Sequence, residues 1–374
     1  MTVVLPNPGR RPRGGPSRRA GSGEATAIHR RLPGYAPTPL VAAPTLAAAI
    51  GVGELWVKDE SSRLGLPAFK ILGASWAAFR SLCALVALDP GRTTVDALGA
   101  ALAVDGGWQL VTATDGNHGR AVAHMAALLG IGARILVPRG TAAARIESIA
   151  GEGATVEVVD GSYDDAVEAA AALASDRAVV ISDTSWPGYR EVPAWVVDGY
   201  RTIFAEADEQ LAAQGAVAPD VVVVQMGVGS LAVAAVRYRW SGEPSDPTIV
   251  VVEPTSAACG LRSAEAGHPV VVPGPHRSIM AGLNCGSVSE QAWPELSAGV
   301  DVFVGIEDAD AEQAMRDLDG LGIVAGETGG SGLAGLRALV AEGSYPLPAD
   351  ASVLVINTEG ATDPANHARI CCSS

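Results

Sequence analysis

The chain has 374 residues, of which 48% are hydrophobic and 18% charged, so it can build a sizeable core and is not wholly disordered. Its 41 acidic and 26 basic residues give a net charge of −15, which argues against nucleic acid or an anionic membrane as a partner. The length predicts two domains or one large α/β unit. Two of the basic residues are lysines, Lys58 and Lys70, so chemistry that needs a side-chain amine has two candidates.

The N-terminal residues differ in charge from the rest of the chain. Residues 1–31 hold seven arginines and one acidic residue, Glu24, and residues 6–22 are rich in Gly, Pro, Ser and Arg. This composition predicts a disordered basic tail over residues 1–24. No apolar segment follows its arginine pairs, so we expect no secretory signal and a cytoplasmic protein. No run of about eighteen apolar residues occurs, so we expect no membrane-spanning helix.

Apolar segments of strand length alternate along the chain with segments of helix length. Many are rich in Val and Ile without alternation, which is typical of parallel strands covered on both faces. The predicted strands are residues 54–58, 109–113, 134–137, 155–159, 178–182, 221–226, 248–253, 302–305 and 352–356. The predicted helices include residues 141–150, 164–173, 195–211 and 309–318. This order predicts an α/β fold with one or two open, mostly parallel twisted sheets and flanking helices.

In such a fold, ligands bind beyond the carboxyl ends of the strands, so the loops there are the first place to look. After the first predicted strand, Ala68-Phe69-Lys70 opens a helical segment. The positive end of the helix dipole disfavours a charged amine, so this position favours a neutral, nucleophilic Lys70. The alternative is an ordinary exposed lysine.

Two glycine-containing loops suit an anion. Residues 114–119, with the sequence Thr-Asp-Gly-Asn-His-Gly, follow the strand at 109–113 and form either an anion site or a simple turn. The second loop follows the strand at 221–226 and suits a phosphate, although it is neither a Walker loop nor a complete GxGxxG motif. It consists of Gly227, Val228, Gly229, Ser230 and Leu231.

Polar residues also follow two other strands. Asp183 follows the strand at 178–182 and suits either a helix cap or a carboxylate that faces an active site. Residues 357–364, with the sequence Asn-Thr-Glu-Gly-Ala-Thr-Asp-Pro, form either a set of polar ligands or a C-terminal turn. The five cysteines and six histidines lack the spacing of a zinc site or a disulfide framework, so we expect no metal.

Taken in this order, the segments resemble the fold-type-II pyridoxal-phosphate enzymes, and among these the diaminopropionate ammonia-lyases. The resemblance is carried by Ala68-Phe69-Lys70, by residues 114–119 and by residues 358–364, and it covers nearly the whole chain outside the arginine-rich tail. It implies two sheets arranged as in the β subunit of tryptophan synthase. It also implies a large cofactor-binding domain over residues 25–75 and 190–374 and a small domain over residues 76–189.

The resemblance implies pyridoxal 5'-phosphate as the cofactor and gives roles to the residues that bind it. Lys70, beside Phe69, matches the lysine that holds the cofactor covalently, and Asn117 matches the residue that contacts the hydroxyl of its ring. The loop at residues 227–231 matches the phosphate-binding loop. Asn357 and Thr358 lie where this fold type places a neutral partner for the pyridine nitrogen, which moderates the electron sink.

The resemblance makes Lys70, Asp115 and Asp183 the catalytic residues. The position of Asp115 is usually small and uncharged in serine and threonine dehydratases, whereas it is an Asp in diaminopropionate ammonia-lyases. A carboxylate can hold the second, cationic amine of a substrate, or it can accept the α-proton. We therefore expect a homodimer that eliminates ammonia from a small amino acid, 2,3-diaminopropionate, and forms pyruvate.

Other interpretations remain open. The same cofactor supports β-replacement or the dehydration of serine or threonine, and a doubly wound fold can also belong to a non-catalytic small-molecule-binding protein. Cys259 and Cys285 match a cysteine pair that members of the family can bridge, although a cytoplasmic location disfavours the disulfide.

Overall fold

The computed structural model describes residues 2–11, 22–114, 116–239 and 246–372, and the chain divides into two compact units. Unit 1 comprises Met1–Gly21, Pro37–Arg63 and Ile203–Ser374, and unit 2 comprises Ser22–Ala36 and Leu64–Thr202. These bounds differ from the predicted domain boundaries at residues 75 and 190. Within unit 2, the imidazole of His29 bonds to Thr202 Oγ1 at 2.8 Å and to Leu72 O at 2.9 Å. These contacts explain why segments distant in sequence belong to one unit.

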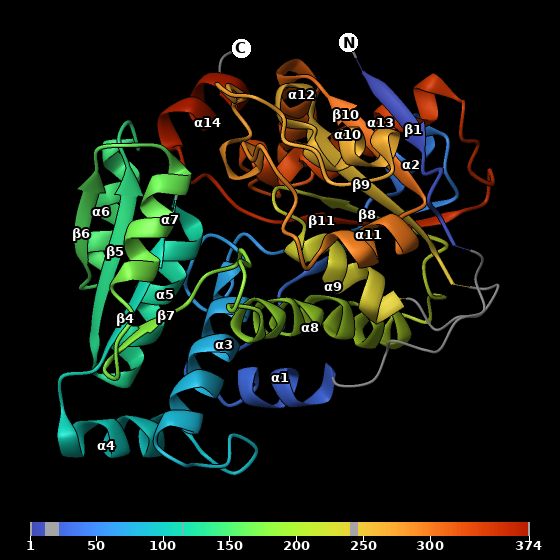
Figure 1. The fold of residues 1–374 in the computed structure, drawn as a ribbon. Coiled ribbons are helices and arrows are strands. Elements are labelled where there is room, and N and C mark those ends of the chain that lie inside the picture. Colours follow the sequence, from blue (N-terminus) through green and yellow to red (C-terminus); the bar gives the residue numbers. More distant parts are fainter. Residues whose placement is uncertain (1, 12–21, 115, 240–245, 373–374) are drawn as a thin grey trace. The chain divides into compact units, whose positions relative to one another are not determined.

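Unit 1 contains, within the described residues, a seven-stranded sheet in the order β1-β10-β9-β8-β11-β3-β2 (Figure 1). The five inner strands are parallel, and the edge strands β1 and β2 are antiparallel to their neighbours. The inner strands are almost wholly buried, as expected for parallel strands that helices cover on both faces. The strands are β1 (Val3–Pro6), β2 (Leu40–Ala42), β3 (Glu54–Asp59), β8 (Val221–Gln225), β9 (Thr248–Pro254), β10 (Val302–Ile306) and β11 (Ser352–Asn357).

Strand β1 and helix α1 (Ser22–His29) correct the prediction of a disordered tail over residues 1–24, because residues 3–6 and 22–24 are ordered. β1 pairs with β10 along its whole length, and Arg10 Nε lies 2.8 Å from Asp301 Oδ1 just beyond it. A strand of four residues whose partner lies at the other end of the chain leaves no local pattern to detect. Residues 12–21 lie outside the described part of the chain.

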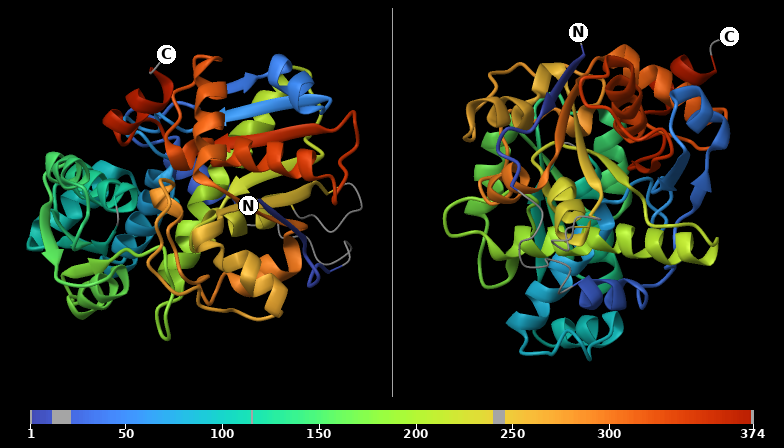
Figure 2. Two further views of the ribbon diagram at one scale, coloured as in Figure 1. Left: turned by 90° about the horizontal axis from the view of Figure 1, so that it is seen from above. Right: turned by 90° about the vertical axis from the view of Figure 1, so that its right-hand side faces the viewer.

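The helices of unit 1 include α13, which packs along strands of the sheet and is rich in glycine. A Cβ atom at Gly335 would lie 2.2 Å from Val252 Cγ2, so only glycine permits the close approach of this helix to β9. α14 packs on α12 and is the red helix beside the C-terminal label in both views of Figure 2. The helices are α2 (Pro44–Ile50), α9 (Ser230–Arg239), α10 (Cys259–Ala266), α11 (Trp293–Gly299), α12 (Asp308–Asp319), α13 (Glu327–Glu342) and α14 (Pro364–Cys371).

Unit 2 contains, within the residues that the structure describes, a four-stranded parallel sheet in the order β6-β5-β4-β7. Its strands are β4 (Gln109–Ala113), β5 (Gly132–Pro138), β6 (Thr155–Val159) and β7 (Ala178–Val180). Its helices are α1 (Ser22–His29), α3 (Lys70–Leu85), α4 (Val95–Asp105), α5 (Asn117–Leu129), α6 (Ala143–Gly151) and α7 (Tyr163–Ala172), and the division between the units falls within α8 (Glu191–Ala213).

The two sheets confirm the predicted α/β fold with mostly parallel strands. No helix in the described ranges is both long enough and apolar enough to cross a bilayer.

Candidate active site

Lys70 lies at the start of α3, where Phe69 is the N-cap residue. Its Nζ atom lies 2.9 Å from Asp183 Oδ2. The same atom lies 5.4 Å from the ring centroid of Phe69 and 5.8 Å from that of Tyr200, which α8 contributes to unit 2. The side chain of Lys70 is 24% exposed. Aromatic rings and one carboxylate therefore hold an accessible amine in a fixed place.

Asp183 follows β7 and is buried beside Lys70. Burial alone would raise the pKa of this carboxyl, but the positive charge of Lys70, with a contribution from His118, holds it well below its usual range. Asp183 is thus a carboxylate at neutral pH. The next helix begins at Glu191, so the structure favours the carboxylate interpretation over the helix cap. The ion pair also stabilises positive charge on Lys70, which the prediction of a neutral amine from the helix dipole did not include.

The glycine loop before α5 is a turn built around Thr114. Its Oγ1 atom accepts hydrogen bonds from Gly116 N at 2.9 Å and from Gly119 N at 3.0 Å. These two amides are therefore engaged within the loop, which favours the turn interpretation for both glycines. Asn117 is the first residue of α5. Asp115 lies outside the described residues.

The second glycine loop belongs to unit 1 and joins β8 to α9. Its carbonyl groups accept hydrogen bonds from neighbouring groups. Gly227 O accepts from Cys259 Sγ at 3.7 Å, Val228 O from Ser289 N at 2.9 Å, and Gly229 O from Val233 N at 2.9 Å. In a trans peptide the N–H points away from the C=O of the same peptide. The N–H groups of Val228, Gly229 and Ser230 therefore point away from the partners of these three carbonyls. At the N-terminus of a ten-residue helix, such amides suit a phosphate dianion.

Gly229 adopts a φ of +110°, and a Cβ atom there would lie 2.8 Å from Leu296 Cδ1. We expect Gly229→Ala to weaken the binding of a phosphorylated ligand by at least about tenfold, because strain of about 1–2 kcal/mol would displace the loop amides. A titration of the purified protein with pyridoxal phosphate, followed by tryptophan fluorescence, measures this effect.

The matched control is Gly215→Ala, at an exposed turn where φ is +70° and no atom lies near the new Cβ. This substitution imposes similar backbone strain away from the loop, so we expect it to leave the affinity unchanged. Equal affinities of the two variants would show that the loop does not bind the phosphate.

Asn357 and Thr358, at the end of β11, have different partners. Asn357 Nδ2 donates to Asp59 Oδ1 at 2.8 Å, so its amide is engaged within the protein. Thr358 Oγ1 accepts from Gln225 Nε2 at 2.8 Å. Gln225 Nε2 also donates to the carbonyl of Thr328 at 2.8 Å, which fixes this nitrogen as a donor. The hydroxyl hydrogen of Thr358 is therefore directed elsewhere, where it can bond to an unprotonated aromatic nitrogen.

Gln225 is the residue that the sequence reasoning missed in this part of the site. It ends the Val221–Val224 segment just before the glycine loop, and this change from apolar to polar is the signal that could have identified it.

Cys259 and Cys285 are both near Gly227, and neither forms a disulfide in the structure. Burial, reinforced by the nearby Glu253, raises the pKa of Cys259, so it is an unreactive thiol. Glu253 is also buried and accepts from Gly260 N and Leu261 N at 2.8 Å each. Burial raises the pKa of Glu253 to about 7 despite these hydrogen bonds.

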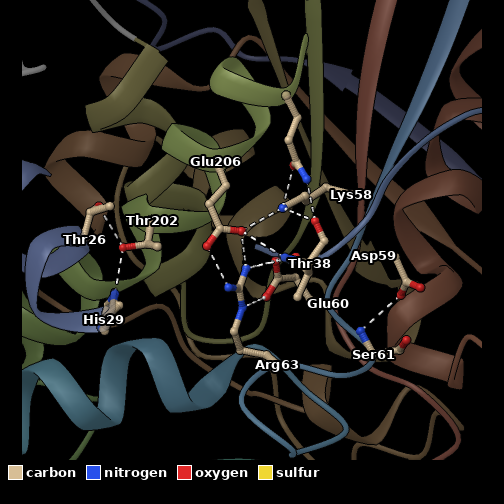
Figure 3. Close-up of polar contacts among 11 residues, drawn as sticks. Thr26, His29, Thr38, Lys58, Asp59, Glu60, Ser61, Arg63, Thr202 and Glu206 are labelled. Atoms are coloured by element: carbon tan, nitrogen blue, oxygen red, sulfur yellow. Dashed lines mark hydrogen bonds and ion pairs between the residues drawn. The ribbon is translucent and has the colours of Figure 1, made fainter. Parts of the chain in front are cut away.

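Lys58, the second lysine, belongs to a buried ion cluster of unit 1 that we define as Lys58, Glu60, Arg63 and Glu206 (Figure 3). Lys58 Nζ lies 2.8 Å from Glu206 Oε2, and Arg63 Nη2 lies 2.7 Å from both Glu60 Oε1 and Glu206 Oε2. All four side chains are 0% exposed. Burial lowers the pKa of Lys58, although Glu60 and Glu206 oppose the shift. Lys58 thus has a structural role, and Lys70 is the lysine available for chemistry.

Comparisons with known proteins cover almost the whole chain. The family model described as "Pyridoxal-phosphate dependent enzyme" matches residues 31–359. Diaminopropionate ammonia-lyase of Salmonella typhimurium is 37% identical over 360 residues, which are 91% of this chain and 89% of that protein. The enzyme of that name from Escherichia coli K12 is 38% identical over 363 residues, 92% and 90% of the two chains.

A solved structure agrees with this result. The crystal structure of diaminopropionate ammonia lyase from Escherichia coli in complex with D-serine has a TM-score of 0.91 and 35% sequence identity. The match covers 99% of this chain and 96% of that one.

Proposed function

The chain belongs to the pyridoxal-phosphate dependent enzymes and, among them, to the diaminopropionate ammonia-lyase family, and we propose that it eliminates ammonia from 2,3-diaminopropionate to form pyruvate. The observation that carries the proposal is the pair formed by Lys70 and Asp183, an accessible amine held by a buried carboxylate. The chain's other lysine is enclosed in a buried ion cluster, so Lys70 is the candidate for covalent attachment of the cofactor.

Three features of the described residues fit pyridoxal phosphate. Lys70 offers an amine, and the amides of the loop at residues 227–231 suit a phosphate dianion. The hydroxyl of Thr358 accepts a hydrogen bond from Gln225, so its own hydrogen is left to donate to a pyridine nitrogen that is not protonated. We propose that Asn117 contacts the ring hydroxyl, as the family resemblance implies. When bound, the cofactor supplies an electron sink for negative charge on the substrate's α-carbon.

The residues of the chain transfer protons and stabilise charge during the reaction. In this proposal, Lys70 would hold the cofactor covalently, and Lys70 or Asp115 removes the α-proton of the substrate. Asp183 stays ionised and stabilises the ammonium form of Lys70, while the β-amine, which is already protonated, leaves as neutral ammonia. Asp115 also suits the cationic second amine of a diamino acid. Hydrolysis of the released product gives pyruvate and a second ammonia.

The experiment that tests the function compares substrates side by side. Purified protein is incubated with diaminopropionate, serine or threonine, and the corresponding keto acid is measured. We expect kcat/KM for diaminopropionate to exceed that for serine by about 100-fold or more, because serine leaves the substrate-binding carboxylate without its cationic partner, a loss of about 3 kcal/mol.

The outcomes separate the alternatives. Equal rates with serine would identify a dehydratase. A product that forms only when an external nucleophile is added would identify β-replacement. A protein that stays colourless after the addition of pyridoxal phosphate would contradict every proposal that uses the cofactor. We also propose that the protein is a homodimer, as the family resemblance implies, and that it is located in the cytoplasm.

A further inference from the structure

α14 and the end of α12 bring together three side chains that are common metal ligands. His367 and Cys371 are four residues apart on α14, so they lie on the same face of this helix. Asp319 is the last residue of α12. One ligand atom from each of the three residues lies within 4.8 Å of the other two. We propose that Asp319, His367 and Cys371 form a zinc site that binds the C-terminal helix to α12.

The surroundings of His367 give an independent reason for a ligand. Its Nε2 atom is enclosed and has no hydrogen-bond partner in the part of the chain that the structure describes. A buried ring nitrogen left without a partner costs free energy, and a bound metal ion removes that cost. The enclosed Nε2 atom of His367 is therefore the observation, beside the geometry of the three side chains, that indicates a bound ligand.

The donor set is selective for the class of metal. A thiolate, an imidazole and a carboxylate favour Zn²⁺ over Mg²⁺ or Ca²⁺, which prefer oxygen alone. Zinc bonds of about 2.0–2.3 Å place neighbouring ligand atoms about 3.5 Å apart in a tetrahedron, so small rotations of these side chains complete the site. Two negative ligands balance the charge of the ion, and water takes the fourth position.

Other contacts hold α14 where the site requires it. Arg369 Nη2 lies 2.6 Å from Glu312 Oε1 of α12, and the side chain of Asp363 caps the start of α14. Without metal, burial raises the pKa of Cys371, and Asp319 adds to this rise while Arg316 opposes it. A cation at the site reverses the balance because it stabilises the thiolate. Cys372 is exposed and lies about 100° further around the helix, so we do not assign it as a ligand.

The test uses the untagged, full-length protein with its cofactor. The protein is first treated with a chelator, dialysed against increasing Zn²⁺, and analysed for bound zinc. We expect one zinc per chain and a rise in Tm on binding. With Co²⁺ in place of zinc, we expect thiolate and ligand-field absorption at wavelengths beyond the yellow band of the cofactor.

The variants distinguish this site from chance binding to surface groups. We expect His367→Ala and Cys371→Ser each to weaken zinc binding by at least about tenfold and to lose the cobalt absorption. Cys372→Ser, the neighbouring thiol, is the matched control and keeps both properties. Turnover of diaminopropionate by each variant at the rate of the unmodified protein shows that the variant has folded. Zinc binding that survives Cys371→Ser, or that disappears with Cys372→Ser, overturns the proposal.

Discussion

Replacement of Lys70 by alanine is expected to lower kcat for diaminopropionate by at least about 10³-fold. The variant loses both the amine that links the cofactor and one of the two groups that we propose for removal of the α-proton, and proton transfer by a positioned group contributes about 10²–10⁴-fold. The protein should also lose the visible absorption of the linked cofactor. Absorption and steady-state formation of pyruvate measure the two effects.

Lys70→Arg separates the chemistry of the amine from its charge. An arginine retains a positive group opposite Asp183, so it preserves the ion pair, but its guanidinium remains protonated and cannot become a nucleophile. We expect this variant to fold and to be as inactive as Lys70→Ala. Retained visible absorption and more than about 1% of the normal rate in Lys70→Arg would exclude Lys70 as the covalent attachment point.

The parallel core of the fold could be predicted because each strand is a local apolar segment. The predicted strand at residues 155–159 coincides with β6, whereas β7 ends at Val180, two residues earlier than predicted. Just beyond the strand, the amide of Ser182 donates to the hydroxyl of Tyr189 at 3.0 Å, a side-chain contact that the local sequence pattern does not show. The helix α13 was missed because its glycines have a low helix propensity, and their value in close packing appears only in three dimensions.

The candidate site could be predicted in part for the same reason. Asp183 follows a strand, and Lys70 opens the helix after a loop that follows a strand, so both lie in segments where chemistry was expected. The distance of 2.9 Å between them is a tertiary fact. The hydrogen bond from Gln225 to Thr358 and the burial of Lys58 beside Glu206 are also tertiary facts. Nothing in the local pattern around either lysine shows which is exposed.

The second large effect is expected on stability, at the buried ion cluster. Arg63→Met should lower the free energy of unfolding by about 3–5 kcal/mol, because it leaves Glu60 and Glu206 buried without their main partner. Thermal and urea unfolding of the protein without cofactor measure the change. The control is Arg262→Met, which removes an exposed ion pair with Glu265 and should cost no more than about 1 kcal/mol.

The same cluster predicts a dependence on pH. Burial would raise the pKa of Glu206, but Arg63 and Lys58 hold it below its ordinary value of 4.5. Glu206 therefore adds stability at pH values above 4.5, and this contribution is lost as the pH falls through the lower pKa of the folded state. Arg63→Met should weaken this acid dependence. An Arg63→Met protein as stable as Arg262→Met would show that the cluster's desolvation cost cancels its attraction. Because Arg63 acts here through folding alone, the folded fraction of Arg63→Met should still bind pyridoxal phosphate with unchanged affinity, which Lys70→Ala should not.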